Sequence, residues 1–183
     1  MNFEKGILIV FEGIDGVGKT TQALILLNRL QERGIEAVYF REPSNSKWGR
    51  KIKEKAAFAD SITPEEELDL FQKDRKENLK RNLKPVLKEN KVIILDRYYF
   101  STIAYQGAKG IDPAKIREIN EKFALKPDLV FILDIEVEKG LRRIEEGREK
   151  RDMLFEREEY LVKVREIFKS FKGKNIIHID ALR

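Results

Sequence analysis

One eight-residue segment constrains this chain more than any other feature. Residues 13–20 read G-I-D-G-V-G-K-T, match the pattern G-x-x-x-x-G-K-[ST], and directly follow the apolar run 7–11. In such a loop backbone N–H groups surround phosphates, the lysine reaches the outer phosphates and the hydroxyl residue ligates Mg²⁺. The alternative is a glycine-rich turn without function, but it would not explain why the motif directly follows a predicted strand. The predicted ATP-binding loop comprises Gly13, Ile14, Asp15, Gly16, Val17, Gly18, Lys19, Thr20 and Thr21.

Length and composition favour one intracellular domain. A chain of 183 residues is long enough to bury a core, and no linker or repeat divides it. The 37 basic and 32 acidic residues give a formal charge of +5, but they are interleaved, so no basic stripe for nucleic acid is expected. The absence of cysteine excludes disulfides and thiolate chemistry. Without an export signal or long apolar segment, we expect a cytoplasmic protein with no membrane partner.

Short apolar runs alternate with stretches of helical period along the chain. Such near-continuous apolar strands predict an α/β fold in three layers, with a parallel sheet covered by helices on both faces. The strand runs are 7–11, 37–40, 92–95, 129–133 and 176–179. Helices are expected from Lys19 to near Gly34, over 47–58, from Thr63-Pro64 through Leu87, from Pro113, over 136–146 and over 155–171. Pro85 is expected to kink the third of these helices. Leu24 is assigned to the inner face of the first helix, and His178, in the last strand, to the core.

Asp96 and Arg97 directly follow the apolar run 92–95. Ligands in parallel sheets gather at the carboxyl ends of the strands, so both side chains are expected beside the phosphate loop. There Asp96 would hold Mg²⁺ together with Thr20, and Arg97 would contact phosphate through two N–H groups. The alternative is a structural ion pair at the end of a strand.

Two further patterns each leave two interpretations open. Phe71 and Arg75 share a helix face, which suits stacking and hydrogen bonding to a planar base, but periodicity alone favours Phe71 in the core. Residues 140–152 are densely basic and contain Gly147, which suits either a mobile lid that closes over phosphates or a solvated helix end. Conventional acid and base groups are scarce, as expected where the acceptor is already an ionised phosphate.

Read together, five motifs resemble those of thymidylate kinases over nearly the whole chain. They are F-E-G-I-D-G-V-G-K-T-T-Q (11–22), R-E-P (41–43), F-x-x-x-R (71–75), D-R-Y-Y-F-S-T-I-A-Y-Q-G (96–107) and P-D-L-V-F-I-L-D (127–134). The resemblance implies the phosphate-loop nucleoside-monophosphate kinase fold with five parallel strands, in one domain spanning 1–183 with a lid at about 142–154. It also implies transfer of the γ-phosphoryl group from Mg–ATP to dTMP, giving dTDP and ADP.

The same resemblance assigns roles around the acceptor. Asp15 would bind the 3′-hydroxyl of the deoxyribose, Phe71 would stack on thymine, and Arg75 would donate to its O4. Arg97 would bridge the acceptor phosphate and the transferred group, and Tyr105 would exclude a ribose 2′-hydroxyl. The remaining acceptor residues implied are Pro43, Ser101 and Gln106.

On the donor side, Arg142 or Arg143 would lie along the adenine, in a loop bordered by Asp180 and Ala181. Some family members carry a catalytic arginine where this chain has Gly16, so the resemblance implies that the lid supplies it here, from Arg148, which we prefer, or Arg151. Family members typically form homodimers through helices that include the long third one.

The chain departs from the family at residues 44–46, where Ser-Asn-Ser replaces the Gly-Gly-Thr of many members. Two other functions remain to be compared with dTMP kinase activity. One is a phosphate-loop kinase with a different nucleotide or nucleoside acceptor, and the other is a nucleotide-binding module without catalysis.

Overall fold

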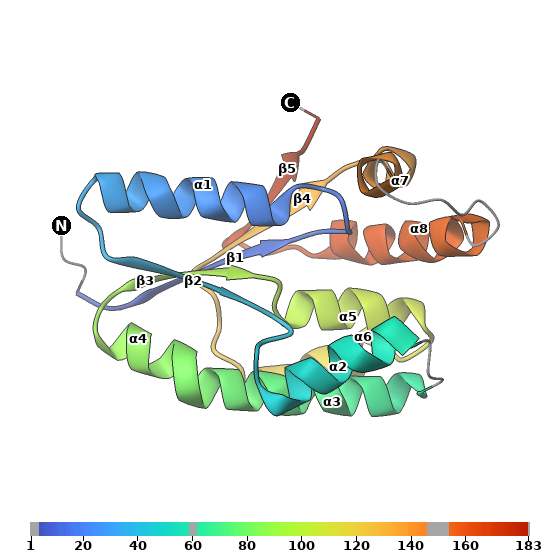
Figure 1. Ribbon diagram of the computed structural model, residues 1–183, viewed down its shortest axis with the longest axis horizontal. Helices are drawn as coiled ribbons and strands as arrows, with labels where there is room; N and C mark the ends of the chain where they lie inside the picture. Colours follow the sequence, from blue (N-terminus) through green and yellow to red (C-terminus); the bar gives the residue numbers. More distant parts are fainter. Residues whose placement is uncertain (1–3, 59–61, 146–153, 183) are drawn as a thin grey trace.

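The computed structural model describes residues 4–58, 62–145 and 154–182. At its centre is a five-stranded sheet of order β2-β3-β1-β4-β5, in which every adjacent pair is parallel (Figure 1). The strands are β1 (Ile7–Glu12), β2 (Ala37–Arg41), β3 (Val92–Asp96), β4 (Leu129–Asp134) and β5 (Ile176–Asp180). The predicted fold class and all five strands are confirmed.

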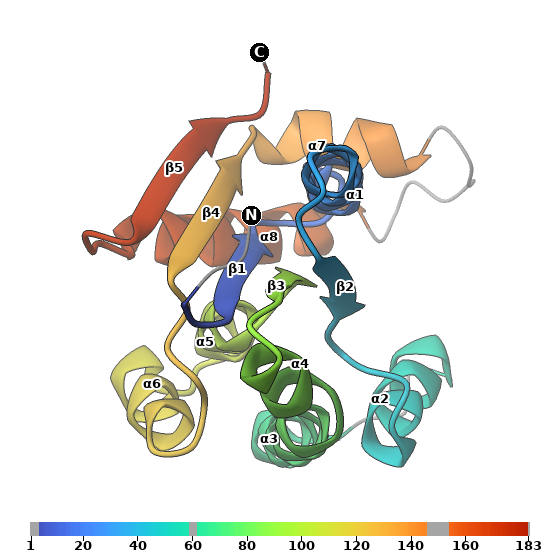
Figure 2. The same ribbon diagram turned by 90° about the vertical axis from the view of Figure 1, so that its left-hand side faces the viewer.

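Helices cover the sheet from both sides, which completes the three layers. α1 lies over one face, whereas α3, α4 and α5 lie below the other (Figure 2). α8 packs on α5 and β4, and α2 packs on α3. The helical segments are α1 (Lys19–Glu32), α2 (Lys47–Phe58), α3 (Pro64–Asn78), the π-helical turn η1 (Leu79–Leu83), α4 (Lys84–Lys88), α5 (Tyr99–Ala108), α6 (Pro113–Glu121), α7 (Val137–Glu145) and α8 (Leu154–Ser170). Within the described ranges, no helix has the length and apolar character that crossing a membrane requires.

The long third helix begins as expected but is not a single α-helix. The Thr63 side chain accepts from the backbone N–H of Glu66, whose carboxylate accepts from the N–H of Thr63, and Pro64 occupies the first turn. The α-helix then gives way to η1 just before Pro85. Proline has no N–H to donate to the carbonyl four residues earlier, so the expected irregularity takes the form of a π-helical turn.

The exposure of two residues, one at the edge of the sheet and one in α1, corrects two predictions. β5 pairs only with β4, and Ile177 and Ile179 are 42% and 39% exposed. His178 is exposed rather than in the core, and its Nε2 lies 2.9 Å from the carbonyl oxygen of Phe171. Leu24, assigned to the inner face of α1, is 40% exposed. An apolar run does not distinguish a strand covered on both faces from one at a sheet edge.

One helix was not predicted at all. α5 begins inside the motif 96–107, whose sequence predicts no helix, ends one residue beyond it, and is buried on nearly every side. A helix that is buried all round shows no apolar stripe of period 3.6, so its pattern gives little warning. The other helices begin within about two residues of the prediction, and so do their ends where an end was predicted.

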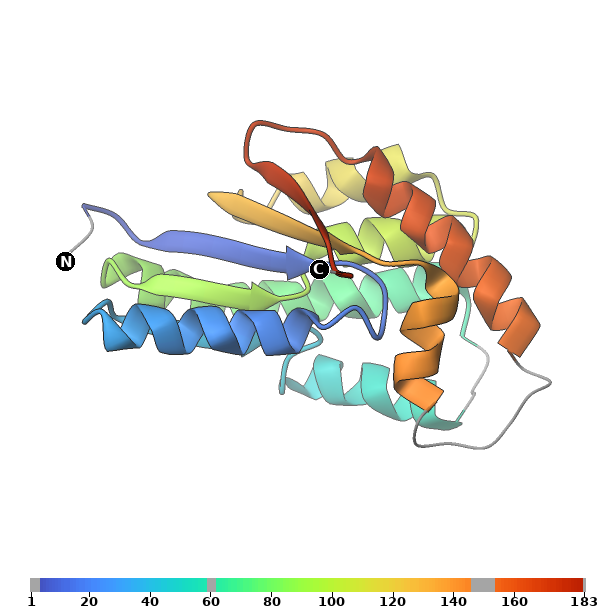
Figure 3. The ribbon, with the colours of Figure 1, turned by 90° about the horizontal axis from the view of Figure 1, so that it is seen from above.

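All five strands point the same way, toward the end of the molecule where the phosphate loop, α7 and the start of α8 meet (Figure 3). Phe11 lies opposite both Asp96 and Phe131 in the sheet. This register brings the ends of β1 and β3 together, so the loops that follow them form one site.

Candidate active site

The phosphate loop connects β1 to α1 and depends on glycine at two positions. Gly13 has φ +135°, and a Cβ built there would lie 2.4 Å from the carbonyl oxygen of Leu133. Gly16 has φ +78°, and its Cβ would lie 2.2 Å from the carbonyl oxygen of Gly140 in α7. Both contacts are too close for any side chain. This backbone therefore leaves no room for an arginine at Gly16.

Lys19 lies at the start of α1 with its side chain buried inside the loop. Its Nζ donates to the carbonyl oxygen of Ile14 at 2.6 Å. Burial, together with the positive charge of Arg97, lowers the pKa of Lys19 to about 7. An anion bound beside it would favour the charged form, so the site as it stands is electrostatically suited to phosphate.

Asp96, at the end of β3, is completely buried and only partly satisfied. Its Oδ2 accepts hydrogen bonds from the Thr20 hydroxyl and, at 3.1 Å, from the Tyr39 hydroxyl. Its Oδ1 has no hydrogen-bond partner among the described residues. In the same part of the chain, no three Asp, Glu, His or Cys side chains are grouped as a metal cage. One carboxylate with one hydroxyl suits Mg²⁺ that is otherwise held by phosphates and water.

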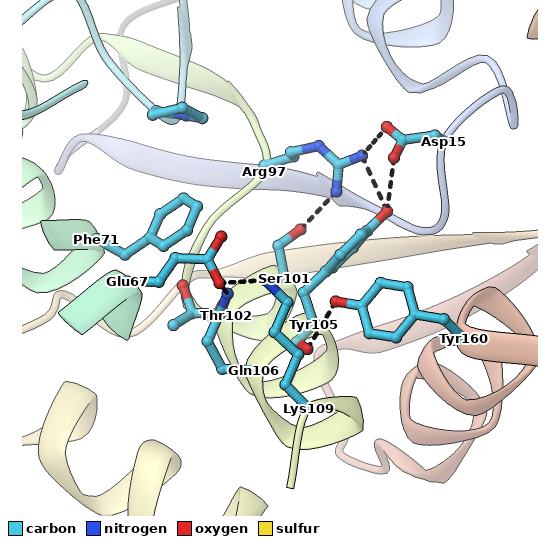
Figure 4. Close-up of a pocket in the computed structure, with 11 residues that line it drawn as sticks. Asp15, Glu67, Phe71, Arg97, Ser101, Thr102, Tyr105, Gln106, Lys109 and Tyr160 are labelled. Carbon is cyan, nitrogen blue, oxygen red and sulfur yellow. Dashed lines mark hydrogen bonds and ion pairs between the residues drawn. The ribbon is translucent and has the colours of Figure 1, made fainter. Parts of the chain in front are cut away.

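Arg97 lies at the centre of a network between the phosphate loop and α5. It has φ +69°, in the left-handed region that non-glycine residues seldom occupy. One terminal nitrogen donates to Asp15 Oδ1 at 2.6 Å, and the other donates to Ser101 Oγ at 2.9 Å (Figure 4). The Tyr105 hydroxyl donates to Asp15 Oδ2 at 3.1 Å. An arginine held in a rare backbone conformation at a strand end is typical of a functional site.

The electrostatics of the network follow from these contacts. Burial raises the pKa of Asp15, but the charges of Arg97 and Lys19 outweigh it, so the pKa is lower than usual. The pKa of Arg97 is raised despite its burial because Tyr105, Asp15 and Glu12 surround it. Asp15 is therefore an anion and Arg97 a cation at neutral pH.

A cavity of about 200 Å³ opens beside this network. Phe71 from α3 forms one wall and Tyr105 from α5 another, and Asp15 and Arg97 lie at the end nearest the phosphate loop (Figure 4). Phe71 therefore faces a cavity and is not a core residue. The full lining is Asp15, Pro43, Glu67, Phe71, Arg97, Ser101, Thr102, Tyr105, Gln106, Lys109 and Tyr160.

Four lining residues were absent from the predicted site. Thr102 lies inside the motif that contains Ser101 and Tyr105, so that motif was the available signal. Glu67 accepts from Gln106 Nε2 at 2.9 Å and also pairs with Lys109. The Tyr160 hydroxyl donates to the carbonyl oxygen of Tyr105 at 2.8 Å. These last three are brought together from α3, the end of α5 and α8, and no local pattern marks them.

Arg75 is not among the residues that line the cavity. Its side chain is 1% exposed, and Nε and one terminal nitrogen contact Glu42 Oε2 at 2.9 and 2.8 Å. It also donates to Thr102 at 2.9 Å and to Asn120. Three of the five N–H groups of the guanidinium are therefore used in hydrogen bonds inside the protein. The expected bond to a base oxygen stays a prediction, since Arg75 is buried among protein partners and is not part of the cavity lining.

A second cavity, of about 520 Å³, lies on the other side of the phosphate loop. Arg143 lines it, whereas Arg142 instead forms an exposed ion pair with Glu138 at 2.5 Å, so the structure favours Arg143 of the two. Arg148 and Arg151 lie outside the described residues. The lining comprises Phe11, Gly16, Val17, Gly18, Thr21, Gln22, Leu133, Arg143, Ile179, Asp180 and Ala181.

Comparison with known proteins identifies the family. A sequence model described as thymidylate kinase matches residues 11–183. The thymidylate kinase of Brachyspira hyodysenteriae is 48% identical over 177 residues, which cover 97% of this chain and 86% of that protein. The probable thymidylate kinase of Archaeoglobus fulgidus is 46% identical over 176 residues, covering 95% and 86%. The chain belongs to the thymidylate kinase family. The predicted recognition is confirmed.

A solved structure of this family extends the likeness to the fold. The crystal structure of thymidylate kinase from Ehrlichia chaffeensis aligns with a TM-score of 0.77 at 32% identity, covering 95% of this chain and 92% of that one. The chain therefore has the phosphate-loop nucleoside-monophosphate kinase fold. Its two cavities both border the phosphate loop, one lined by Asp15 and the other by Gly16, Val17 and Gly18.

The structure also accounts for the departure of this thymidylate kinase family member at residues 44–46. Asp74, buried in α3, accepts from the N–H of Ser44 at 2.8 Å, from its hydroxyl at 2.5 Å and from the hydroxyl of Ser46 at 2.6 Å. Ser46 Oγ in turn accepts from the N–H groups of Trp48 and Gly49 at the start of α2. Both serines therefore tie the loop beside Pro43 to the helix that carries Phe71.

Proposed function

We propose that the protein is a dTMP kinase that binds dTMP in the cavity between α3 and α5 and ATP in the cavity on the other side of the phosphate loop. The observation that carries this proposal is the acceptor cavity itself. An aromatic wall, Phe71, faces Tyr105, and the Asp15–Arg97 pair lies at the end nearest Lys19. A nucleoside monophosphate has a flat base at one end and a phosphate at the other, so it matches this arrangement.

In the proposed complex, Phe71 stacks on the thymine, and Pro43, Ser101 and Gln106 border the sugar and base. Asp15 accepts from the 3′-hydroxyl, and Tyr105 occupies the space that a ribose 2′-hydroxyl would need. Arg97 contacts the acceptor phosphate and the transferred group. Both are anionic, so the positive charges of Arg97 and Lys19 lower the barrier without a general base.

Thr20 and Asp96 would hold Mg²⁺, and the free Oδ1 of Asp96 supports this assignment. The ion neutralises charge on the ATP phosphates when it is bound. Asp96 is oriented for this by the Tyr39 hydroxyl, and Thr20 places its oxygen at the start of α1. On the donor side, Arg143 would lie along the adenine with Asp180 and Ala181 at the border of its cavity.

A catalytic lid arginine remains part of the proposal, because the crowded Gly16 leaves no room for one in the loop. We infer that Arg148, with Arg151 as the alternative, supplies it from the lid at about 142–154 of a single domain spanning 1–183. Each arginine is replaced by alanine in turn. A large fall in kcat with little change in either KM identifies the lid cation, and parent values for both variants exclude this source.

Two further proposals rest on the family resemblance and composition. We infer a homodimer that pairs through helices including α3, and a cytoplasmic location for a chain that has no cysteine. Light scattering coupled to size-exclusion chromatography gives the mass directly. A mass near 21.5 kDa at all concentrations would exclude the dimer.

The decisive experiment is a coupled assay for ADP with ATP, Mg²⁺ and each nucleoside monophosphate in turn. We expect dTMP to give the highest kcat/KM. A preference for another monophosphate would point to a different kinase, and no ADP formation would point to a binding module. Phe71→Ala should raise the KM for dTMP by about fivefold or more, since stacking on a base is worth about 1–3 kcal/mol. Phe123→Ala, which removes an aromatic ring outside the cavity lining, is the matched control.

A further inference from the structure

Glu12 is a buried carboxylate that the proposed reaction does not yet use. It is the last residue of β1, immediately before the phosphate loop, and it is 0% exposed. Its Oε1 accepts from the backbone N–H of Tyr98 at 2.7 Å and from that of Ser101 at 3.2 Å. Its Oε2 accepts from the Ser101 hydroxyl at 2.5 Å. All three donors lie at the start of α5.

These bonds give α5 the cap that its own first residues lack. The N-cap residue is Tyr98, whose side chain makes no capping hydrogen bond to the described helix. The first N–H groups of a helix need acceptors, and an anion there is favoured by the helix dipole. Glu12 supplies both from a different element, 86 residues earlier in the chain. The start of α5 is thereby fixed to the end of β1.

The same carboxylate also acts on Arg97 through Ser101. Glu12 in its ionised form can only accept, and a hydroxyl has one hydrogen to donate, so in that form the hydrogen of Ser101 points toward Glu12. The lone pairs of Ser101 Oγ then face the terminal nitrogen of Arg97, which donates to them at 2.9 Å. Arg97 itself has φ +69° and immediately precedes Tyr98, whose N–H is bound to Glu12. Both the backbone and the guanidinium of Arg97 are therefore anchored by Glu12.

We propose that Glu12 is a positioning residue for phosphoryl transfer: its carboxylate sets the left-handed backbone of Arg97 and the direction of its guanidinium toward the acceptor phosphate. This inference rests on the role proposed above for Arg97. An uncharged amide could accept the two backbone N–H bonds at a lower desolvation cost. It could not accept the Ser101 hydrogen with its nitrogen, and it would remove a charge that favours the Arg97 cation. A buried charge that capping alone does not require points to a role in catalysis.

The test is a double-mutant cycle in the full-length protein at pH 8, where Glu12 is ionised. Each KM is measured by varying ATP or dTMP while the other substrate is saturating and Mg²⁺ is in excess, and kcat is taken from the same curves. The variants are Glu12→Gln, Arg97→Ala and the double variant. We expect Glu12→Gln alone to lower kcat by about tenfold or more while the KM for ATP changes by less than about twofold. In the Arg97→Ala background the same change should have less than about a twofold effect, because the group through which Glu12 acts is gone.

Two outcomes overturn the proposal: parent kcat in Glu12→Gln, or equal losses from that change in both backgrounds. If Arg97→Ala alone keeps the activity of the parent protein, Arg97 does not have the role proposed for it in phosphoryl transfer. That result would contradict the proposed function itself and not only the inference about Glu12. Ser101→Ala keeps the bond from Glu12 to Tyr98 and removes the link to the guanidinium. If Glu12→Gln does not fold, Ser101→Ala is used for the test instead. We then expect kcat to fall, and a kcat equal to that of the parent protein would contradict the proposal.

Asp128→Asn is the matched control. Asp128 also accepts a backbone N–H of β1, that of Leu8 at 2.9 Å, but it lies at the opposite end of the strand. This variant thus removes a carboxylate that is hydrogen-bonded to β1 but lies away from the site. We expect parent kcat in this variant, and a loss equal to that of Glu12→Gln would show that any damage to β1 lowers turnover and would contradict a specific role for Glu12.

Discussion

Glu12 should make the stability of the protein fall as the pH rises, and replacing it should remove this dependence. Burial raises the pKa of Glu12 from 4.5 to about 7, although its hydrogen bonds and Arg97 act in the opposite direction. Between these values the native state holds a proton that the unfolded state has lost. The stabilising contribution is therefore complete below pH 4.5 and is lost as the pH rises through about 7.

The size of the effect follows from the shift. One pKa unit corresponds to about 1.4 kcal/mol, so the group contributes about 3 kcal/mol in total, of which about 2 kcal/mol lies between pH 5 and pH 8. Glu12→Gln has no proton to lose there. Relative to the parent protein, we expect this variant to gain about 2 kcal/mol of unfolding free energy as the pH rises from 5 to 8.

Urea unfolding followed by the fluorescence of the single tryptophan, Trp48, measures this difference at each pH. Asp128→Asn is again the control. The pKa of Asp128 is lowered from 3.8, so its carboxylate is ionised in both states above pH 5 and its replacement should give a constant offset. If the Glu12→Gln difference is flat across this range, or slopes the other way, the carboxylate is not a destabilising buried anion.

Three further predictions test other parts of the site. In a steady-state assay, Arg143→Ala should raise the KM for ATP about fivefold and Arg142→Ala should change it by less than about twofold, because only Arg143 lines the donor cavity. Equal effects of the two substitutions would contradict this assignment. Tyr39→Phe should raise the Mg²⁺ concentration for half-maximal activity about tenfold by releasing Asp96, and an unchanged Mg²⁺ titration would exclude that role. Asp74→Asn should cost about 2 kcal/mol in urea unfolding, since three donors lose a charged acceptor, and parent stability would show that the network is dispensable.

Local patterns were sufficient for the framework of the site. The loop 13–20 is recognisable because its glycines and Lys19 must lie close together in sequence. Each strand is likewise predicted by a short apolar run. The Thr63-Pro64 cap likewise depends on residues three positions apart. Where the physical cause is local, the prediction and the structure agree within one or two residues.

The rest of the site depends on contacts between distant segments. Nothing near Glu12 in the sequence indicates that its partners are Tyr98 and Ser101, since those contacts arise only when β1 lies next to β3. Periodicity also placed Phe71 with the core, because a side chain facing a ligand cavity and one facing the core lie on the same inner side of a helix. Only the packed structure separates it from Arg75, which lies one turn further on and is enclosed.

Two carboxylates position Arg97, Asp15 directly and Glu12 through Ser101, and they differ in exposure to solvent. This difference predicts which of the two contacts a substrate phosphate can replace. Asp15 is 45% exposed at its side chain, whereas Glu12 is completely buried and cannot be reached by a ligand in the cavity. An entering phosphate can therefore compete for the guanidinium nitrogen bound to Asp15, but not for the one bound through Ser101 to Glu12. We expect a crystal structure with dTMP to show the Arg97–Asp15 distance lengthened from 2.6 Å and the Arg97–Ser101 bond intact. If the Arg97–Ser101 bond is broken and the Arg97–Asp15 contact is kept, Glu12 does not fix the position of the guanidinium when dTMP is bound.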